Sequence, residues 1–205
     1  MDVDKKQMTF ADKMRGWFRW FLEPAARFFN RLGIYPNTMT LIGLAGTTLS
    51  ATLVALGHMT WGGLVLLLMG PVDALDGMMA RLRGEASDWG AFVDSVTDRY
   101  AELVVFLGLL IHYLRQDNEP GIVLAYLAAA GSVLVSYIKA RADASKLDAN
   151  VGILTRVERY LVLIPALILN LPSVALWIIA ILANLTALQR ILRVRRDARR
   201  RQSQS

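Results

Sequence analysis

Four long stretches of this sequence contain no charged residue, and this feature limits most strongly what the chain can fold into. The stretches cover residues 32–72, 103–114, 121–138 and 160–189. A helix that crosses the hydrocarbon core of a membrane needs about 20 mostly apolar residues, so the first and last stretches can each hold two crossings. The composition agrees, because 55% of the 205 residues are hydrophobic and the mean hydropathy is +0.39. The sequence therefore predicts an all-α integral membrane protein.

Glycine, proline and asparagine residues divide these stretches into six predicted transmembrane helices. Turn signals of this kind occur near residues 57–63, 118–121 and 170–173. The predicted spans cover residues 37–57, 61–82, 90–114, 120–141, 153–170 and 173–193.

Most of the 23 Lys and Arg residues fall on one side of this predicted membrane protein. They precede the first span, follow the last, and flank the connections near residues 81–83 and 139–159. Because basic loops face the cytoplasm, both termini are predicted to be cytoplasmic. The same bias accounts for the net charge of +6, so no nucleic-acid partner is expected.

The two ends of the chain differ from the predicted spans. Residues 1–35 alternate aromatic and basic side chains, which predicts an amphipathic helix in the membrane interface. A soluble helix packed on a partner is the alternative. Residues 194–205 are predicted to be a basic cytoplasmic tail with no fold of its own, which leaves residues 36–193 as one six-helix domain. No cleavable signal peptide is expected, and without cysteine the chain can form neither disulfides nor zinc–cysteine sites.

Four aspartates stand at the facing ends of the second and third predicted spans. Asp73 and Asp76 are three residues apart and Asp94 and Asp98 four apart, so each pair shares a helix face. The short connection makes the two helices antiparallel neighbours whose pairs can face each other. Carboxylates gathered without cations repel one another, and Mg²⁺ or Mn²⁺ would neutralise them, with two ions expected. Such a site calls for a phosphate-bearing substrate.

The residues between the aspartate pairs suit a phosphate ligand. Gly77 lies one turn after Asp73 and removes side-chain bulk where a ligand approaches. Arg81 shares a helix face with Gly77 and can bind a phosphate.

The pattern Asp-x-x-Asp-Gly-x-x-Ala-Arg, eight residues, Gly-x-x-x-Asp-x-x-x-Asp resembles the signature of the CDP-alcohol phosphatidyltransferases. Its fixed positions are all present, as Asp73, Asp76, Gly77, Ala80, Arg81, Gly90, Asp94 and Asp98. The resemblance implies an enzyme in which a CDP-linked lipid donates its phosphoalkyl group to an acceptor hydroxyl and releases CMP. It also implies a homodimer in the cell membrane, with six spans and a cytoplasmic active site.

The resemblance implies roles for individual residues as well. The metal ions would be held by the four aspartates, and Asp98 would also be the general base. A segment that opens the first span resembles the donor-binding Pro-Asn-x-x-Thr of the family, although Asn37 or Thr38 can equally be an ordinary helix cap. The residues implied to contact the CDP-lipid are Asn37, Thr38, Thr40, Gly77, Arg81 and Ser87.

Three cations at the predicted cytoplasmic depth bear on the acceptor. Lys139, Arg156 and Arg190 can form a cradle for a phosphorylated acceptor, which choline would not need. The alternative is that they only set membrane orientation. The segments Tyr-Ile-Lys-Ala-Arg-Ala and Gly-Ile-Leu-Thr-Arg-x-Glu-Arg resemble the phosphatidylinositol phosphate synthases and their archaeal counterparts. This resemblance implies myo-inositol 1-phosphate as acceptor and CDP-diacylglycerol, or an ether-lipid analogue, as donor.

Two other functions remain open at this point. Glycerol 3-phosphate as acceptor, which would give phosphatidylglycerol phosphate, is the closest. A cation transporter is the alternative from another class, because acidic side chains within a membrane also mark ion pathways. Against a transporter, the four aspartates all lie near one predicted surface. Arg159 is expected to set orientation or to pair with a signature carboxylate or Glu158.

Overall fold

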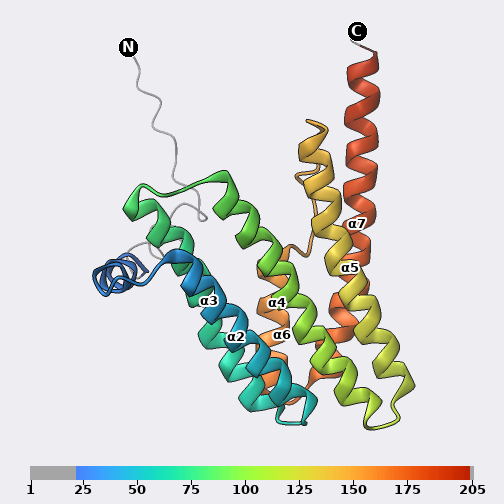
Figure 1. Cartoon of the computed structure of the whole chain (residues 1–205). Helices are drawn as coiled ribbons and strands as arrows, with labels where there is room; N and C mark the ends of the chain where they lie inside the picture. Colours follow the sequence, from blue (N-terminus) through green and yellow to red (C-terminus); the bar gives the residue numbers. More distant parts are fainter. Residues whose placement is uncertain (1–21, 204–205) are drawn as a thin grey trace, which may run out of the picture. The chain divides into compact units, whose positions relative to one another are not determined.

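The computed structural model describes residues 22–203, and every regular element within that range is a helix (Figure 1). Residues 22–31 form the first helical segment. It is followed by α2 (Pro36–Ala55), α3 (Met59–Arg83), α4 (Asp88–Leu114), α5 (Glu119–Ala144), α6 (Arg156–Ile168) and α7 (Pro172–Gln202). The prediction of an all-α chain is confirmed, and the six labelled helices coincide with the six predicted spans to within a few residues, except at the start of α6 and the end of α7.

Four of these helices, α2, α3, α5 and α7, are long and apolar enough to cross a membrane. Helix α4 is long enough, but Asp98, Arg99 and Glu102 interrupt its apolar stretch. Helix α6 has 13 residues, which rise about 20 Å, whereas a hydrocarbon core is about 30 Å thick. Residues 153–155 were predicted to belong to the fifth span and are not helical. The described residues thus contain four candidate spans.

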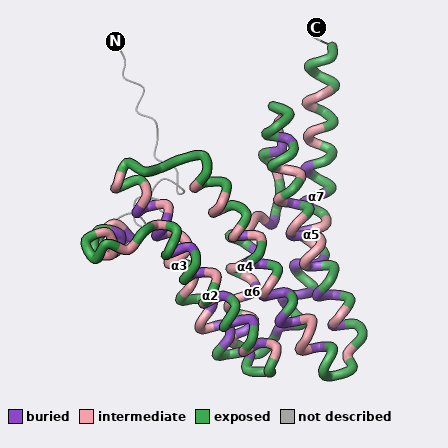
Figure 2. The backbone as a smooth tube through the Cα atoms, viewed as in Figure 1, coloured by how far each residue is buried: buried purple, intermediate pink, exposed green. Residues whose placement is uncertain are grey.

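Exposed positions occur along all six labelled helices (Figure 2), and many of them carry large apolar side chains. Leu41, Trp61, Leu68, Val123 and Trp177 have exposed fractions between 55% and 66%. Soluble proteins rarely leave so much apolar surface in water, whereas lipid is a suitable environment for it. The exposure supports the prediction of a membrane protein.

The chain forms two compact units, and α2, α3 and α4 each contribute residues to both. The described part of the first unit consists of residues 22–43 and 68–97. Its apolar cluster joins residues of the helical segment 22–31 to α2 and α3. The cluster consists of Leu22, Ala26, Met39, Leu75, Met78 and Met79.

Arg83, in the last turn of α3, binds the residues that precede α2. Its Nε donates to Asn30 Oδ1 at 2.7 Å, and its Nη2 donates to the carbonyl oxygen of Ile34 at 2.7 Å. Its guanidinium also lies 5.2 Å from the ring centroid of Tyr35. The start of α2 is therefore fixed in the first unit. Residues 1–21, which hold most of the predicted interfacial helix, lie outside the described residues.

The second unit consists of residues 44–67 and the described residues from 98 onward. In it α7 packs along α5 and α6 (Figure 1). The close approach of α5 and α7 depends on Gly131, where a Cβ would lie 2.7 Å from Asn184 Nδ2. The core includes the fully buried Val54, Leu109, Ala125, Leu167 and Ile179.

Helix α7 continues well beyond the predicted end of the last span. The expectation that residues 194–205 have no fold is wrong for residues 194–202, which are helical. Arg and Ala are good helix formers, and two aspartates anchor this extension. Arg193 donates to Asp148 Oδ2 at 2.6 Å, and Asp197 accepts from the Asp148 amide at 3.0 Å. The Asn150 amide and the Arg193 guanidinium hold the pKa of Asp148 below its usual value.

Gly108 provides a test of packing in the second unit. A Cβ at this position would lie 2.4 Å from the carbonyl oxygen of Ala51, so Gly108→Ala forces backbone to move. We expect a loss of about 1–3 kcal/mol in the free energy of unfolding. The same substitution at Gly70, where a Cβ would meet nothing within 4 Å, is the matched control. Thermal unfolding in detergent measures both, and equal Tm values would contradict the packing described here.

Candidate active site

A cleft of about 330 Å³ lies within the first unit. It is formed by the start of α2, the end of α3, the connection after α3 and the start of α4. Its lining residues are Tyr35, Pro36, Asn37, Thr40, Asp76, Gly77, Ala80, Arg81, Glu85, Ala86, Ser87, Trp89, Gly90, Ala91 and Asp94. Of the six residues implied to contact a CDP-lipid, five line this cleft. The sixth, Thr38, follows Asn37 in the first turn of α2, is exposed, and does not line the cleft.

Asp76 is the buried acid of this cleft, with 5% of its surface exposed. Thr40 Oγ1 donates to its Oδ2 at 2.5 Å, and the amide of Gly77 donates to its Oδ1 at 2.5 Å. Each carboxylate oxygen therefore accepts a hydrogen bond, which offsets part of the cost of burial. Thr40 also links the first turns of α2 to α3.

Two signature aspartates of the first unit, Asp73 and Asp94, lie close together. A carboxylate oxygen of Asp73 and one of Asp94 are within 4.8 Å of each other, although they belong to different helices. Helix α4 continues without interruption from Asp94 to Asp98, which lies one turn further along. Hard cations take oxygen ligands of this kind, so the donor set fits Mg²⁺ or Mn²⁺.

Gly77 and Ser87 each lie beside a residue of the signature. A Cβ at Gly77 would lie 3.6 Å from Arg81 Nη1, which is an ordinary contact, so the guanidinium lies over the helix beside this glycine. Ser87 precedes α4, and its Oγ accepts a hydrogen bond from the Gly90 amide at 3.1 Å, as a helix cap does. Helix α2 begins at Pro36, so Asn37 and Thr38 lie in its first turn and neither is its cap.

In the second unit, Asp98 forms an ion pair with Arg156, the first residue of α6. Arg99 Nη1 lies 4.0 Å from the same carboxylate oxygen. Asp98 is buried and Arg156 is half-buried, so the pair is only partly screened by solvent. The implied general base and a residue of the predicted acceptor cradle are thus in direct contact.

The other two predicted acceptor residues have partners of their own. Lys139 Nζ donates to Asp143 Oδ1 at 2.6 Å, one turn along α5. Arg190 is 8% exposed and donates to two carbonyl oxygens, those of Val151 at 3.0 Å and Val135 at 2.6 Å. Val135 lies one turn before Lys139, and Val151 lies five residues before Arg156. Arg190 therefore connects the backbone near both other cations.

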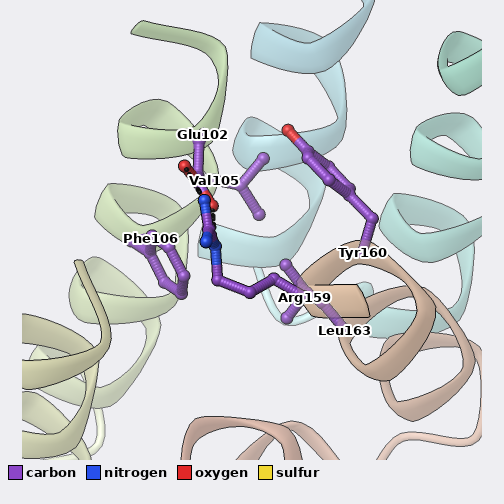
Figure 3. A pocket seen from close by; sticks show the side chains of 6 residues that line it. All are labelled: Glu102, Val105, Phe106, Arg159, Tyr160 and Leu163. Atoms are coloured by element: carbon purple, nitrogen blue, oxygen red, sulfur yellow. Dashed lines mark hydrogen bonds and ion pairs between the residues drawn. The ribbon is translucent and has the colours of Figure 1, made fainter. Parts of the chain in front are cut away.

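One pair was not identified from the sequence. Arg159 is paired with Glu102, neither with a signature carboxylate nor with Glu158 (Figure 3). The spacing contained a signal, because Glu102 lies four residues after Asp98 and Arg159 lies three residues after Arg156. Both positions repeat, one turn later, the positions of the Asp98–Arg156 pair.

Comparisons with known proteins identify the family of the chain. The family model described as CDP-alcohol phosphatidyltransferase matches residues 33–188. The chain belongs to this family and is a CDP-alcohol phosphatidyltransferase.

Several relatives resemble the chain over most of their length. A phosphatidylinositol phosphate synthase of Mycolicibacterium smegmatis is 38% identical over 84% of this chain and 82% of the relative. An archaetidylinositol phosphate synthase of Pyrococcus horikoshii is 31% identical over 87% of this chain and 93% of the relative.

Solved structures of the Mycobacterium tuberculosis phosphatidylinositol phosphate synthase resemble the fold. The structure with CDP-DAG bound has a TM-score of 0.79 and 30% identity, over 84% of this chain and 92% of that chain. The complex with manganese and citrate has the same TM-score and identity, over 84% and 88%.

Thr40 tests the hydrogen bonding of Asp76. Thr40→Val keeps the shape of the side chain and removes the donor, which leaves a buried carboxylate oxygen without this bond. We expect the free energy of unfolding to fall by about 1–3 kcal/mol, whereas Thr40→Ser, which keeps the hydroxyl, should lose less. Thermal unfolding in EDTA compares the three proteins. If Thr40→Val and the parent unfold at the same temperature, the hydrogen bond does not stabilise Asp76.

Proposed function

We propose that this protein is a phosphatidylinositol phosphate synthase. It transfers the phosphatidyl group of CDP-diacylglycerol, or an ether-lipid analogue, to myo-inositol 1-phosphate and releases CMP. The cleft is the observation that supports a CDP-linked lipid as donor. Its lining places two signature aspartates beside Asn37, Thr40, Gly77, Arg81 and Ser87. The names of the relatives support an inositol phosphate as the acceptor.

The acidic donor set supports a metal-dependent reaction. Asp73, Asp76, Asp94 and Asp98 are proposed to hold two ions, Mg²⁺ or Mn²⁺, and a homologous synthase was solved with manganese. When bound, such ions offset the negative charge of the pyrophosphate and of the CMP leaving group.

The protein side chains have separate tasks in the cleft. Arg81 is exposed, lines the cleft beside Gly77 and binds the donor pyrophosphate. The polar side chains of Asn37, Thr38 and Thr40 lie in the first turns of α2, where backbone N–H groups favour an anion. Ser87 contacts the donor from the start of α4.

The reaction is a direct displacement at phosphorus. The acceptor hydroxyl oxygen forms a bond to the phosphorus that carries the diacylglycerol group, and the bond from that phosphorus to the CMP oxygen breaks. Asp98 accepts the hydroxyl proton, and CMP departs with the electron pair of the broken bond. Lys139, Arg156 and Arg190 hold the phosphate of the acceptor away from the reacting phosphorus.

The proposed membrane arrangement has six spans, with α4 and α6 crossing beside the four candidate spans. Both termini and the active site then face the cytoplasm, in agreement with the distribution of Lys and Arg. Residues 151–155, which precede the short α6, add to the depth of membrane that this part of the chain crosses. We propose a homodimer in the cell membrane.

Asp98 is the residue that tests the chemistry. Asp98→Asn keeps the shape of the side chain and removes its capacity to accept a proton, so we expect turnover to fall by about 10²–10⁴-fold. Binding of CDP-diacylglycerol, measured by calorimetry in detergent, should change little. Asp117→Asn is the control, because Asp117 is exposed and has a positive φ of 52° that asparagine tolerates. Full turnover by Asp98→Asn would refute the assignment.

The acceptor is decided by competition in proteoliposomes that contain CDP-diacylglycerol and Mn²⁺. Radiolabelled myo-inositol 1-phosphate should enter the lipid fraction, and excess EDTA should stop its incorporation. Unlabelled glycerol 3-phosphate should compete poorly, because the cradle is proposed to fit the inositol phosphate. Incorporation of labelled glycerol 3-phosphate but not of inositol phosphate would replace the proposed function with phosphatidylglycerol phosphate synthesis. Release of no CMP with either acceptor would reject both.

A further inference from the structure

We infer that Glu102 and Arg159 form a positioning pair that sets the place of Arg156 for binding the acceptor. The inference rests on the proposed function, and it assigns a task to two buried charges that take no part in the proposed chemistry. Neither side chain lines the donor cleft.

The geometry of the pair restricts both partners. Arg159 Nε donates to Glu102 Oε1 at 2.6 Å, and Arg159 Nη2 donates to Glu102 Oε2 at 3.0 Å. This two-point contact fixes distance and orientation together, which a single hydrogen bond does not. Arg159 is 2% exposed and Glu102 is 4% exposed. Figure 3 shows the two side chains meeting among apolar and aromatic neighbours, which include Val105, Phe106 and Leu163.

The pair continues a ladder that begins with Asp98 and Arg156. Arg156 is one turn before Arg159 on α6, and Asp98 is one turn before Glu102 on α4. Both ion pairs therefore join the same two helices in the same direction. A shift of α6 by one residue moves it about 1.5 Å along its axis and breaks the two-point contact. The buried pair thus sets the register in which Arg156 meets Asp98.

Arg159 also holds the segment that leads into α6. Its Nη1 donates to the carbonyl oxygen of Leu154 at 3.3 Å. The amide of Leu154 donates to Thr186 Oγ1 at 3.1 Å, which connects the same residue to α7. Leu154 is only two residues before Arg156. The hydrogen bond from Arg159 of α6 and the one to Thr186 of α7 therefore both fix the start of α6.

Stability alone does not explain a charged pair at this position. A buried ion pair contributes little or nothing more than apolar residues of similar volume would contribute. Leu163 and Leu167 already give α6 a buried apolar face. A fixed orientation is what the two-point contact adds, and Arg156 is the residue of α6 that needs it.

The test replaces the whole pair with apolar residues, in the double variant Glu102→Leu with Arg159→Met. No charge is left buried without a partner, so the variant should stay folded with a Tm close to that of the parent. We expect binding of CDP-diacylglycerol to be unchanged and KM for myo-inositol 1-phosphate to rise by about tenfold or more. Arg159→Lys keeps the charge and loses the two-point contact, so its KM should be intermediate.

Tyr113→Phe is the matched control. It removes another contact of α4, the 2.7 Å hydrogen bond between Tyr113 Oη and Ser173 Oγ, and it should leave the acceptor KM unchanged. Parental kinetics in a folded double variant would overturn the inference. If the double variant does not fold, Glu102→Gln decides, and a parental acceptor KM in that variant overturns the inference. Absence of inositol phosphate incorporation by the parent would instead reject the proposed function.

Discussion

A charged side chain among packed helices must be matched by a partner, and this constraint organises both units of the protein. Five charged side chains are buried within residues 22–203: Asp76, Asp98, Glu102, Arg159 and Arg190. Each has a partner that suits its chemistry. Asp76 accepts hydrogen bonds from a hydroxyl and an amide, and Asp98 pairs with a guanidinium group. Glu102 and Arg159 pair with each other, and Arg190 donates to backbone carbonyls. These partners join separate helices, so the polar contacts set how the helices pack.

The positions of the helices could be predicted because an apolar helix is a local property of the sequence. The boundaries of α6 and α7 could not. Gly152 has a φ of 139° and lies between two backbone groups that bond to α7: the carbonyl oxygen of Val151 accepts from Arg190, and the amide of Leu154 donates to Thr186. The residues before Arg156 therefore do not join the helix. The start of the basic tail is held because Asp148, from the loop after α5, accepts from Arg193 and donates its amide to Asp197 of the tail. Both differences depend on contacts between residues far apart in the sequence, which composition does not contain.

The signature aspartates could be predicted because their spacing matches the helical repeat. The partners of Arg156 and Arg190 could not, since they lie 39 to 58 residues away in the chain. Lys139 differs, because its partner Asp143 lies one turn along the same helix. When only the sequence is considered, Lys139, Arg156 and Arg190 are compatible with a phosphate cradle, and membrane orientation is the alternative. Their contacts add a distinction. Arg190 is mainly bound to backbone, whereas Arg156 contacts the implied base.

The contacts of these cations also bear on the charge that an acceptor must carry. Lys139 and Arg156 are already neutralised by Asp143 and Asp98, and two nitrogens of Arg190 donate to carbonyl oxygens. An acceptor that binds at the proposed cradle has to compete with these internal partners. A phosphate group brings close to two negative charges and several strong acceptor oxygens, which a neutral polyol lacks and the single carboxylate of a zwitterion does not equal. At the proposed cradle, these contacts therefore favour an acceptor that enters with a phosphate, because an acceptor without one would leave the internal ion pairs intact.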